Sequence, residues 1–147
     1  MAIVNYPQDF LKAVMDLVAA DALTLAGGKI RLFTVGPTFA PGVTWAEFTE
    51  AAFDGYAASA AVTWGAAYQD AAGNGVVAGA SHQFTMSGIT TPETVIGAAL
   101  VVDGTPKVLL AYVTFDNPIP MSQIGDAIIV VPIVGLPGPV DFLVAGP

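Results

Sequence analysis

The second half of the chain contains three stretches in which both alternating sets of positions are apolar. They run over Val95–Val102, Lys107–Phe115 and Asp126–Val134. A strand that is apolar on both faces is covered on both faces in the folded protein. In a small antiparallel fold one cover is the facing sheet, so we expect the other cover to be a helix or a second subunit.

A half-buried strand is predicted over Lys29–Val35, where polar and apolar positions alternate. Lys29 and Arg31 fall on one face, and Ile30 and Leu32 fall on the other. The two cations either solvate an edge strand or pair with an acidic surface of a partner. We favour the first interpretation, because charged side chains commonly protect strand edges.

Shorter strands are predicted between turn signals. Gly73-Asn74-Gly75 predicts one hairpin, and Asp103-Gly104 predicts another between the first two doubly apolar strands. Leu136–Pro147 is either an extended tail or a final edge strand. The short strands cover Ala60–Trp64, Val76–Ala80 and Ser81–Ser87, while Ala66–Asp70 extends the first of them or pairs with the second.

The whole pattern predicts one mainly β domain, an antiparallel β-sandwich or jelly roll of about eight strands. We divide it into an N-terminal helical segment at 1–28, a β body at 29–136 and a Pro/Gly tail at 137–147. The N-terminal helix is expected over Asn5–Ala20, with Pro7 in its first turn. It packs on its own sheet or docks on a neighbour, and we favour the first. Its apolar stripe consists of Phe10, Leu11, Val14, Leu17 and Val18.

A second, short helix is predicted inside the stretch Val43–Tyr56, the densest aromatic patch in the chain. Thr44 and Glu47 have capping-box spacing, so we expect the helix to occupy Trp45–Phe53. Asp54-Gly55 then predicts a turn into the next strand. The aromatic residues of the patch are Trp45, Phe48, Phe53 and Tyr56.

Composition points to self-association. The chain has 147 residues, of which 54% are hydrophobic and only 11% are charged. A monomeric domain exposes more charge than this, and no run approaches the roughly 20 apolar residues of a membrane-spanning helix. We therefore expect no membrane segment and burial of the apolar surplus between subunits. Asp9, Lys12 and Asp16 interrupt the N-terminal apolar positions, so we expect no signal peptide.

Charge and cysteine content narrow the function further. The formal net charge is −8 with four basic residues, which disfavours nucleic-acid binding. The chain has no cysteine, so disulfides, thiolate catalysis and cysteine metal sites are excluded.

Catalytic patterns are weak throughout. His82 is the single histidine, and one imidazole is too few for the histidine-rich metal sites of β proteins. Glu47 and Glu50 are three residues apart on one short element, whereas glycosidase carboxylates face each other across a cleft. Asp70–Gly75 matches a hairpin turn better than a calcium loop. We expect no catalytic, cofactor or metal site. The serines considered as nucleophiles, none in a G-x-S-x-G elbow, are Ser59, Ser81, Ser87 and Ser122.

Several short motifs occur in an order that resembles a family of small tailed-phage virion proteins. Ile30–Phe33 is followed by a Pro/Thr loop and by Thr44–Tyr56, which contains F-T-E-A-x-F-x-G-Y. A strand ending at Thr63-Trp64 comes next, and Gly125–Ile128 supplies a Gly-Asp followed by a strand. The resemblance covers Lys29–Pro137, and some members of the family are capsid decoration, or cement, proteins.

The resemblance implies a non-enzymatic virion protein, a homotrimer that binds the major capsid protein on the outer capsid surface. Such a protein is made in the cytoplasm of the host bacterium. The N-terminal segment lies outside the shared pattern and is the element we most expect to contact a partner. Val113 and Ile129 are expected to point outward from their strands. The expected partner or subunit contacts are Phe10, Val14, Leu17, Trp45, Val113 and Ile129.

Two alternatives stay open. The protein is a tail or fibre component, or it is a carbohydrate-binding jelly roll. Aromatic side chains that lie exposed and coplanar in a groove would favour sugar binding, whereas buried ones would favour the structural role. The aromatic residues in question are Trp45, Tyr56, Trp64 and Tyr68.

Overall fold

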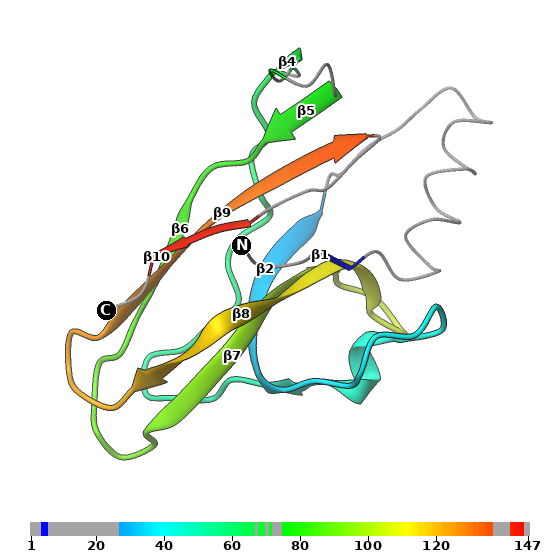
Figure 1. Ribbon diagram of the computed structural model, residues 1–147. Helices are drawn as coiled ribbons and strands as arrows, with labels where there is room; N and C mark the ends of the chain where they lie inside the picture. The colour runs from blue at the N-terminus through cyan, green and yellow to red at the C-terminus, as the bar shows by residue number, and fades with distance from the viewer. Residues whose placement is uncertain are drawn as a thin grey trace.

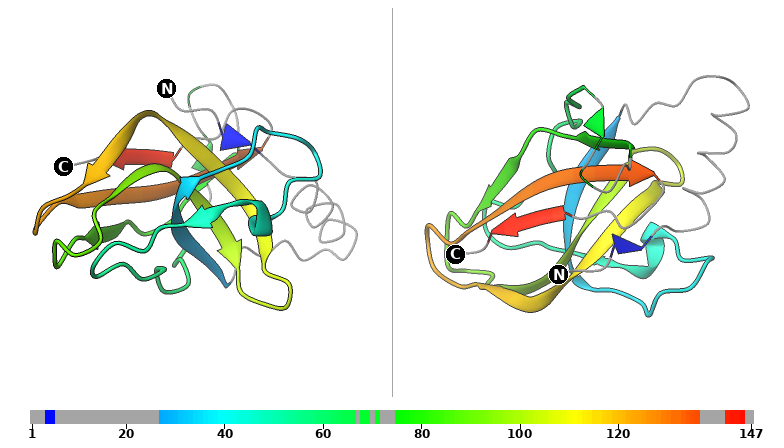
Figure 2. Two further views of the ribbon diagram at one scale, coloured as in Figure 1. Left: turned by 90° about the horizontal axis from the view of Figure 1, so that it is seen from below. Right: turned by 45° about the horizontal axis from the view of Figure 1, so that its top comes forward.

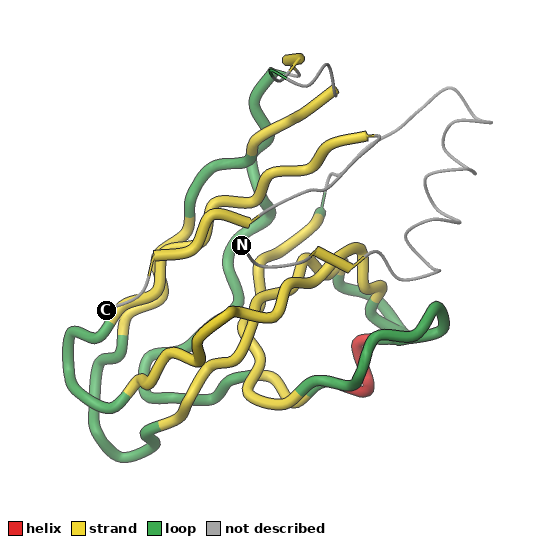
Figure 3. The backbone as a smooth tube through the Cα atoms, in the orientation of Figure 1, coloured by secondary structure: helices red, strands yellow, loops and turns green. Residues whose placement is uncertain are grey.

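The computed structural model describes residues 4–5, 27–66, 68–69, 71, 75–136 and 142–145. This part of the chain is mainly β, with every strand pair antiparallel, as predicted. Its strands form two sheets of five (Figure 1). Helix is limited in the described residues to one 3-10 turn, η1 (Trp45–Glu47), the red segment in Figure 3.

The first sheet contains the longest hairpin of the fold. β7 (Glu93–Val102) and β8 (Val108–Met121) are joined at Asp103-Gly104, as the sequence predicted. β2 (Gly28–Val35) pairs with the other edge of β7. The strand order is β1 (Val4–Asn5), β8, β7, β2 and β3 (Thr49–Glu50).

The second sheet is built around β9 (Ala127–Leu136). β5 (Gly75–Ala78) and β6 (His82–Thr85) pair one after the other along the same edge of β9. β10 (Phe142–Ala145) pairs with the opposite edge of β9. Of the two alternatives for this segment, an extended tail or a final edge strand, the described residues 142–145 therefore match the edge strand. β4 (Tyr68–Gln69) pairs with β5 and confirms the predicted hairpin.

The segment 59–65 links the two sheets at one side. The Ser59 and Val62 N–H groups donate to carbonyls of β2 at 3.0 and 2.8 Å, so this part lies beside the first sheet. The Gly65 N–H donates to the Ala78 carbonyl at 2.8 Å, which attaches the next residues to the second sheet. The strand predicted over Ala60–Trp64 is therefore a connection with isolated bridges, because its two ends pair with different sheets.

The main core lies between the sheets. It contains inward-facing residues of β2, β7 and β8 together with β6 and β9 of the other sheet. The alternation predicted for β2 is confirmed, because Ile30 and Leu32 are buried in this core. Its largest fully buried side chains are Leu32, Phe53, Met86, Leu100, Met121 and Ile128.

A second core covers the outer face of the first sheet. Val101, Leu109 and Tyr112 of the β7–β8 hairpin pack there against Val43 and Trp45. The hairpin is thus covered on both faces, as predicted. Of the two expected outer covers, a helix or a second subunit, the first applies in part at this place: a segment of the same chain that contains the 3-10 turn η1 folds back over the sheet (Figure 2, left).

The inserted helix is shorter than predicted. The Thr44 N–H donates to Glu47 Oε2 at 2.8 Å, the glutamate half of the predicted capping box. η1 ends after one turn, however, and Thr49–Glu50 form β3 instead of continuing the helix to Phe53. Pairing of β3 with β2 outweighs local helix preference there.

Two other predicted boundaries also differ. The N-terminal helix predicted over Asn5–Ala20 lies outside the described residues, except for Asn5 in β1. β8 runs beyond the predicted end at Phe115 and includes Pro118 and Pro120. Among the described strands only β7 pairs with this end of β8, and prolines are tolerated on such an edge.

Candidate functional site

A network of charged side chains lies on the outer face of the first sheet, at its β2 side. The Arg31 guanidinium contacts Glu50 Oε1 and Asp103 Oδ1, both at 2.6 Å. Lys29 Nζ lies 2.7 Å from Asp103 Oδ2. These contacts with Lys29 and Arg31 hold the pKa of Asp103 below its usual value. The two cations therefore bind acids of their own chain, which accounts for them without an acidic partner.

Tyr56 connects this network to the main core. Its hydroxyl donates to Glu50 Oε1 at 2.8 Å and accepts from the Leu32 N–H at 3.1 Å. Burial raises the pKa of Tyr56 far above its usual value, so the phenol stays protonated. Glu50 thus ties together three segments, a role that sequence analysis missed because the partners are distant in sequence. The sequence did place Lys29 and Arg31 on one face of the strand, which indicated that acidic partners could be needed on that face.

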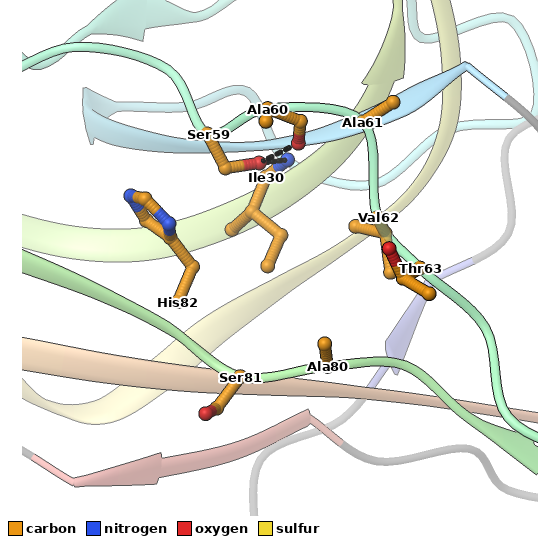
Figure 4. A pocket seen from close by; sticks show the side chains of 9 residues that line it. All are labelled: Ile30, Ser59, Ala60, Ala61, Val62, Thr63, Ala80, Ser81 and His82. Atoms are coloured by element: carbon orange, nitrogen blue, oxygen red, sulfur yellow. Dashed lines mark hydrogen bonds between the residues drawn. The ribbon is translucent and has the colours of Figure 1, made fainter.

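The segment that links the sheets lines a pocket of about 140 Å³ (Figure 4). The His82 ring points toward the Ser59 side of the pocket, the Ser59 Oγ is turned to Ile30 and Ala60, and the Ser81 side chain points away. The lining residues are Ile30, Ser59, Ala60, Ala61, Val62, Thr63, Ala80, Ser81 and His82. No carboxylate is among the described residues that line this pocket.

The pocket's serine and histidine are engaged in structural contacts. Ser59 Oγ accepts from the Ile30 N–H at 2.8 Å and donates to the Ala60 carbonyl at 2.6 Å. Its proton is therefore directed at the backbone instead of a general base. Desolvation lowers the pKa of His82, and its ring packs edge-on against Phe84 with centroids 4.5 Å apart. The Ser59 hydrogen bond to Ile30 holds the linking segment on β2, whereas the His82 ring contact lies within β6.

Most of the aromatic side chains considered for sugar binding pack into the protein. Trp45 is buried and stacks on Phe48, with centroids 5.2 Å apart. Tyr56 stacks on Phe84, and Trp64 packs against the main core. Tyr68 is the exposed one of the four, at 51%. Three of the four side chains thus pack against the two cores, and Trp45 is the one that is fully part of a core.

The residues expected to contact partners or subunits have different surroundings. Val113 is fully buried in the main core, so the expectation of an outward side chain is wrong there. Trp45 is buried in the second core, and Ile129 on β9 is 38% exposed. Phe10, Val14 and Leu17 lie outside the described residues. Partner contacts at the other five positions stay predictions.

Comparison with known proteins leaves the chain without an assigned family. No family model matches the sequence, and no curated protein or solved structure does so either. In the residues covered by the structure, no helix is long and apolar enough to cross a membrane, and no group of three or more potential metal ligands occurs.

Proposed function

We propose that this protein is a non-enzymatic structural component of a tailed-phage virion, a decoration protein that binds the lattice of the major capsid protein and stabilises the head. The packing of Trp45, Tyr56 and Trp64 into the two cores supports it most directly. These large side chains hold the β body together instead of lining a sugar groove. The order of short motifs over Lys29–Pro137 gives the phage context.

The proposal includes a β-sandwich of the jelly-roll type and a closed trimer. Because the chain itself covers the outer face of the first sheet, self-association is assigned to the second sheet. Ile129 lies on β9 between the buried Ile128 and Val130, so its exposed side chain marks the outer face of that sheet. An apolar position there suits a subunit contact.

Binding after assembly explains how such a protein would act without chemistry. A protein that binds the assembled lattice, and not the free capsid subunits, stabilises the lattice by mass action. The role needs a rigid body and a docking surface. Two cores and the Arg31 network provide the rigidity.

The test uses heads that lack this protein. Purified chain is mixed with them, and bound protein is measured after sedimentation through a cushion. We expect saturable binding and a higher temperature of DNA release from the decorated heads. Failure to bind intact heads, with binding to purified tails instead, would replace the decoration role with the tail alternative.

A further inference from the structure

Three loops meet at the end of the molecule opposite the β7–β8 turn. They comprise residues 53–56, 86–92 and 122–126, and together we call them the loop end. The Met86 N–H donates to the Asp126 carbonyl, and the Gly125 N–H donates to the Met86 carbonyl, at 2.8 and 2.9 Å. The Ser87 N–H donates to the Asp54 carbonyl at 2.9 Å. Figures 1 and 2 show these loops side by side.

An aspartate shapes each of the two outer loops. Asp54 accepts hydrogen bonds from the Thr90 and Thr91 N–H groups, and the Thr91 hydroxyl donates to its Oδ1 at 3.0 Å. Asp126 Oδ2 accepts from the N–H groups of residues 122 and 123, both at 2.8 Å. Beneath them, Met86 is fully buried in the main core. The loop end is therefore held in one conformation.

Each fixed loop presents an isoleucine to solvent. Ile89 directly precedes the residues bound by Asp54, and Ile124 directly follows those bound by Asp126. Their exposed fractions, 67% and 68%, are the largest among the large apolar side chains of the described residues. A rigid loop that exposes isoleucine is typical of a docking surface, because little conformational entropy is lost on binding.

Charge distinguishes this end from the β7–β8 end. Glu93 directly follows the 86–92 loop and adds a third acidic group to Asp54 and Asp126, and its carboxylate accepts a hydrogen bond from the Ala52 N–H at 2.7 Å. The described cations lie elsewhere: Lys29 and Arg31 pair with Asp103, and Lys107 follows the same turn. The loop end thus combines two exposed isoleucines with acidic groups and no lysine or arginine within its three loops.

We propose that the loop end is the surface that docks on a partner protein, at an apolar depression bordered by lysine or arginine. The inference rests on the proposed function and deepens it: this partner surface belongs to the capsid lattice. Ile89 and Ile124 enter the apolar depression, and the basic border complements Asp54, Glu93 and Asp126.

The same charge argument disfavours the other occupants. A second copy docked end to end would bring acidic groups of both copies together. An anionic lipid surface would repel the loop end for the same reason. A partner of opposite charge meets neither obstacle.

The test compares binding of two double variants to heads that lack the protein. Ile89→Ser/Ile124→Ser removes the proposed anchors, and Val35→Ser/Tyr68→Ser is the control, with 55% and 51% exposed side chains outside the loop end. We expect the first variant to bind at least about tenfold more weakly than wild type, and the control to bind like wild type. Wild-type binding should also weaken as NaCl rises from about 0.05 to about 0.5 M.

Melting curves and light scattering on the same variants separate the outcomes. Equal binding by wild type and the loop variant overturns the docking surface alone and leaves the decoration role standing. Absence of wild-type binding overturns the decoration role and this inference with it. A loop variant that loses its oligomeric state, or a wild type that binds anionic vesicles, would assign the loop end to a second copy or to lipid and contradict the proposal.

Discussion

Gly97 is the position at which one added methyl group should disturb the first sheet most. The residue lies in β7, where a β-carbon would sit 2.2 Å from Phe33 Cζ and 2.3 Å from the Val113 carbonyl oxygen. Ordinary β-carbon contacts are longer than 3.0 Å, so either group would have to move. The Phe33 ring is 1% exposed and packs against Phe48 with centroids 4.8 Å apart, and the carbonyl belongs to β8. Neither can yield without disturbing the sheet or the second core.

The expected cost of Gly97→Ala follows from two opposing effects. Overpacking of a core with backbone shifts costs about 1–3 kcal/mol. Alanine also lowers the conformational entropy of the unfolded chain, which raises the free energy of unfolding by about 0.4–1 kcal/mol. One of the two clashes involves backbone, so we place the overpacking cost near the top of its range. The expected net decrease in the free energy of unfolding is then about 2 kcal/mol. For a chain of this size the loss corresponds to a melting temperature lower by about 4–8 °C.

Thermal unfolding followed by circular dichroism measures this difference. Gly42→Ala is the matched control, since nothing lies within 4 Å of the β-carbon it would add. The control should stay within about 0.5 kcal/mol of wild type. If Gly97→Ala melted like Gly42→Ala, the close packing of β7 against Phe33 would be refuted.

Other substitutions and conditions test separate parts of the structure. Glu47→Ala removes the acceptor of the cap on η1 and should lower the unfolding free energy by about 0.5–2 kcal/mol in urea titrations, whereas unchanged stability would mean that the cap contributes nothing. Tyr112→Phe removes a buried hydroxyl that has no partner in the described structure, so urea titration should show equal or greater stability; a loss above about 1 kcal/mol would reveal a partner for that hydroxyl. Hydrogen bonds and ion pairs hold the pKa values of Asp54, Asp103 and Asp126 below the ordinary value, so their contribution is complete above about pH 4 and is lost as pH falls through the lower folded values. Melting temperatures that stay constant from pH 6 down to about pH 2 would contradict that contribution.

The strands were predictable because the order of apolar and polar residues within each strand indicates which side chains are buried. Alternation placed Ile30 and Leu32 inside, and continuous apolar runs marked the β7–β8 hairpin and β9. Each of these signals depends on neighbours within one strand. The short turn motifs then fixed which strands form hairpins.

The cover of the first sheet and the charged network were not predictable in the same way. Val43 lies in a loop and Trp45 lies in the single turn η1, so neither belongs to a periodic pattern that indicates which surface it buries. Glu50 joins β3 instead of a helix because it meets Arg31 and Tyr56 from other segments. The loop end depends on contacts between segments far apart in sequence, and the sequence analysis missed Ile89 and Ile124 for that reason.

Quantitative mass spectrometry of purified virions tests the proposed decoration role most directly. The measurement compares the copy number of this chain with that of the major capsid protein in the same particles. The decoration role predicts a copy number of the same order as the number of capsid subunits in the lattice. It also predicts that the protein purifies with intact shells and is absent from purified tails. A handful of copies per particle, or none, would contradict it.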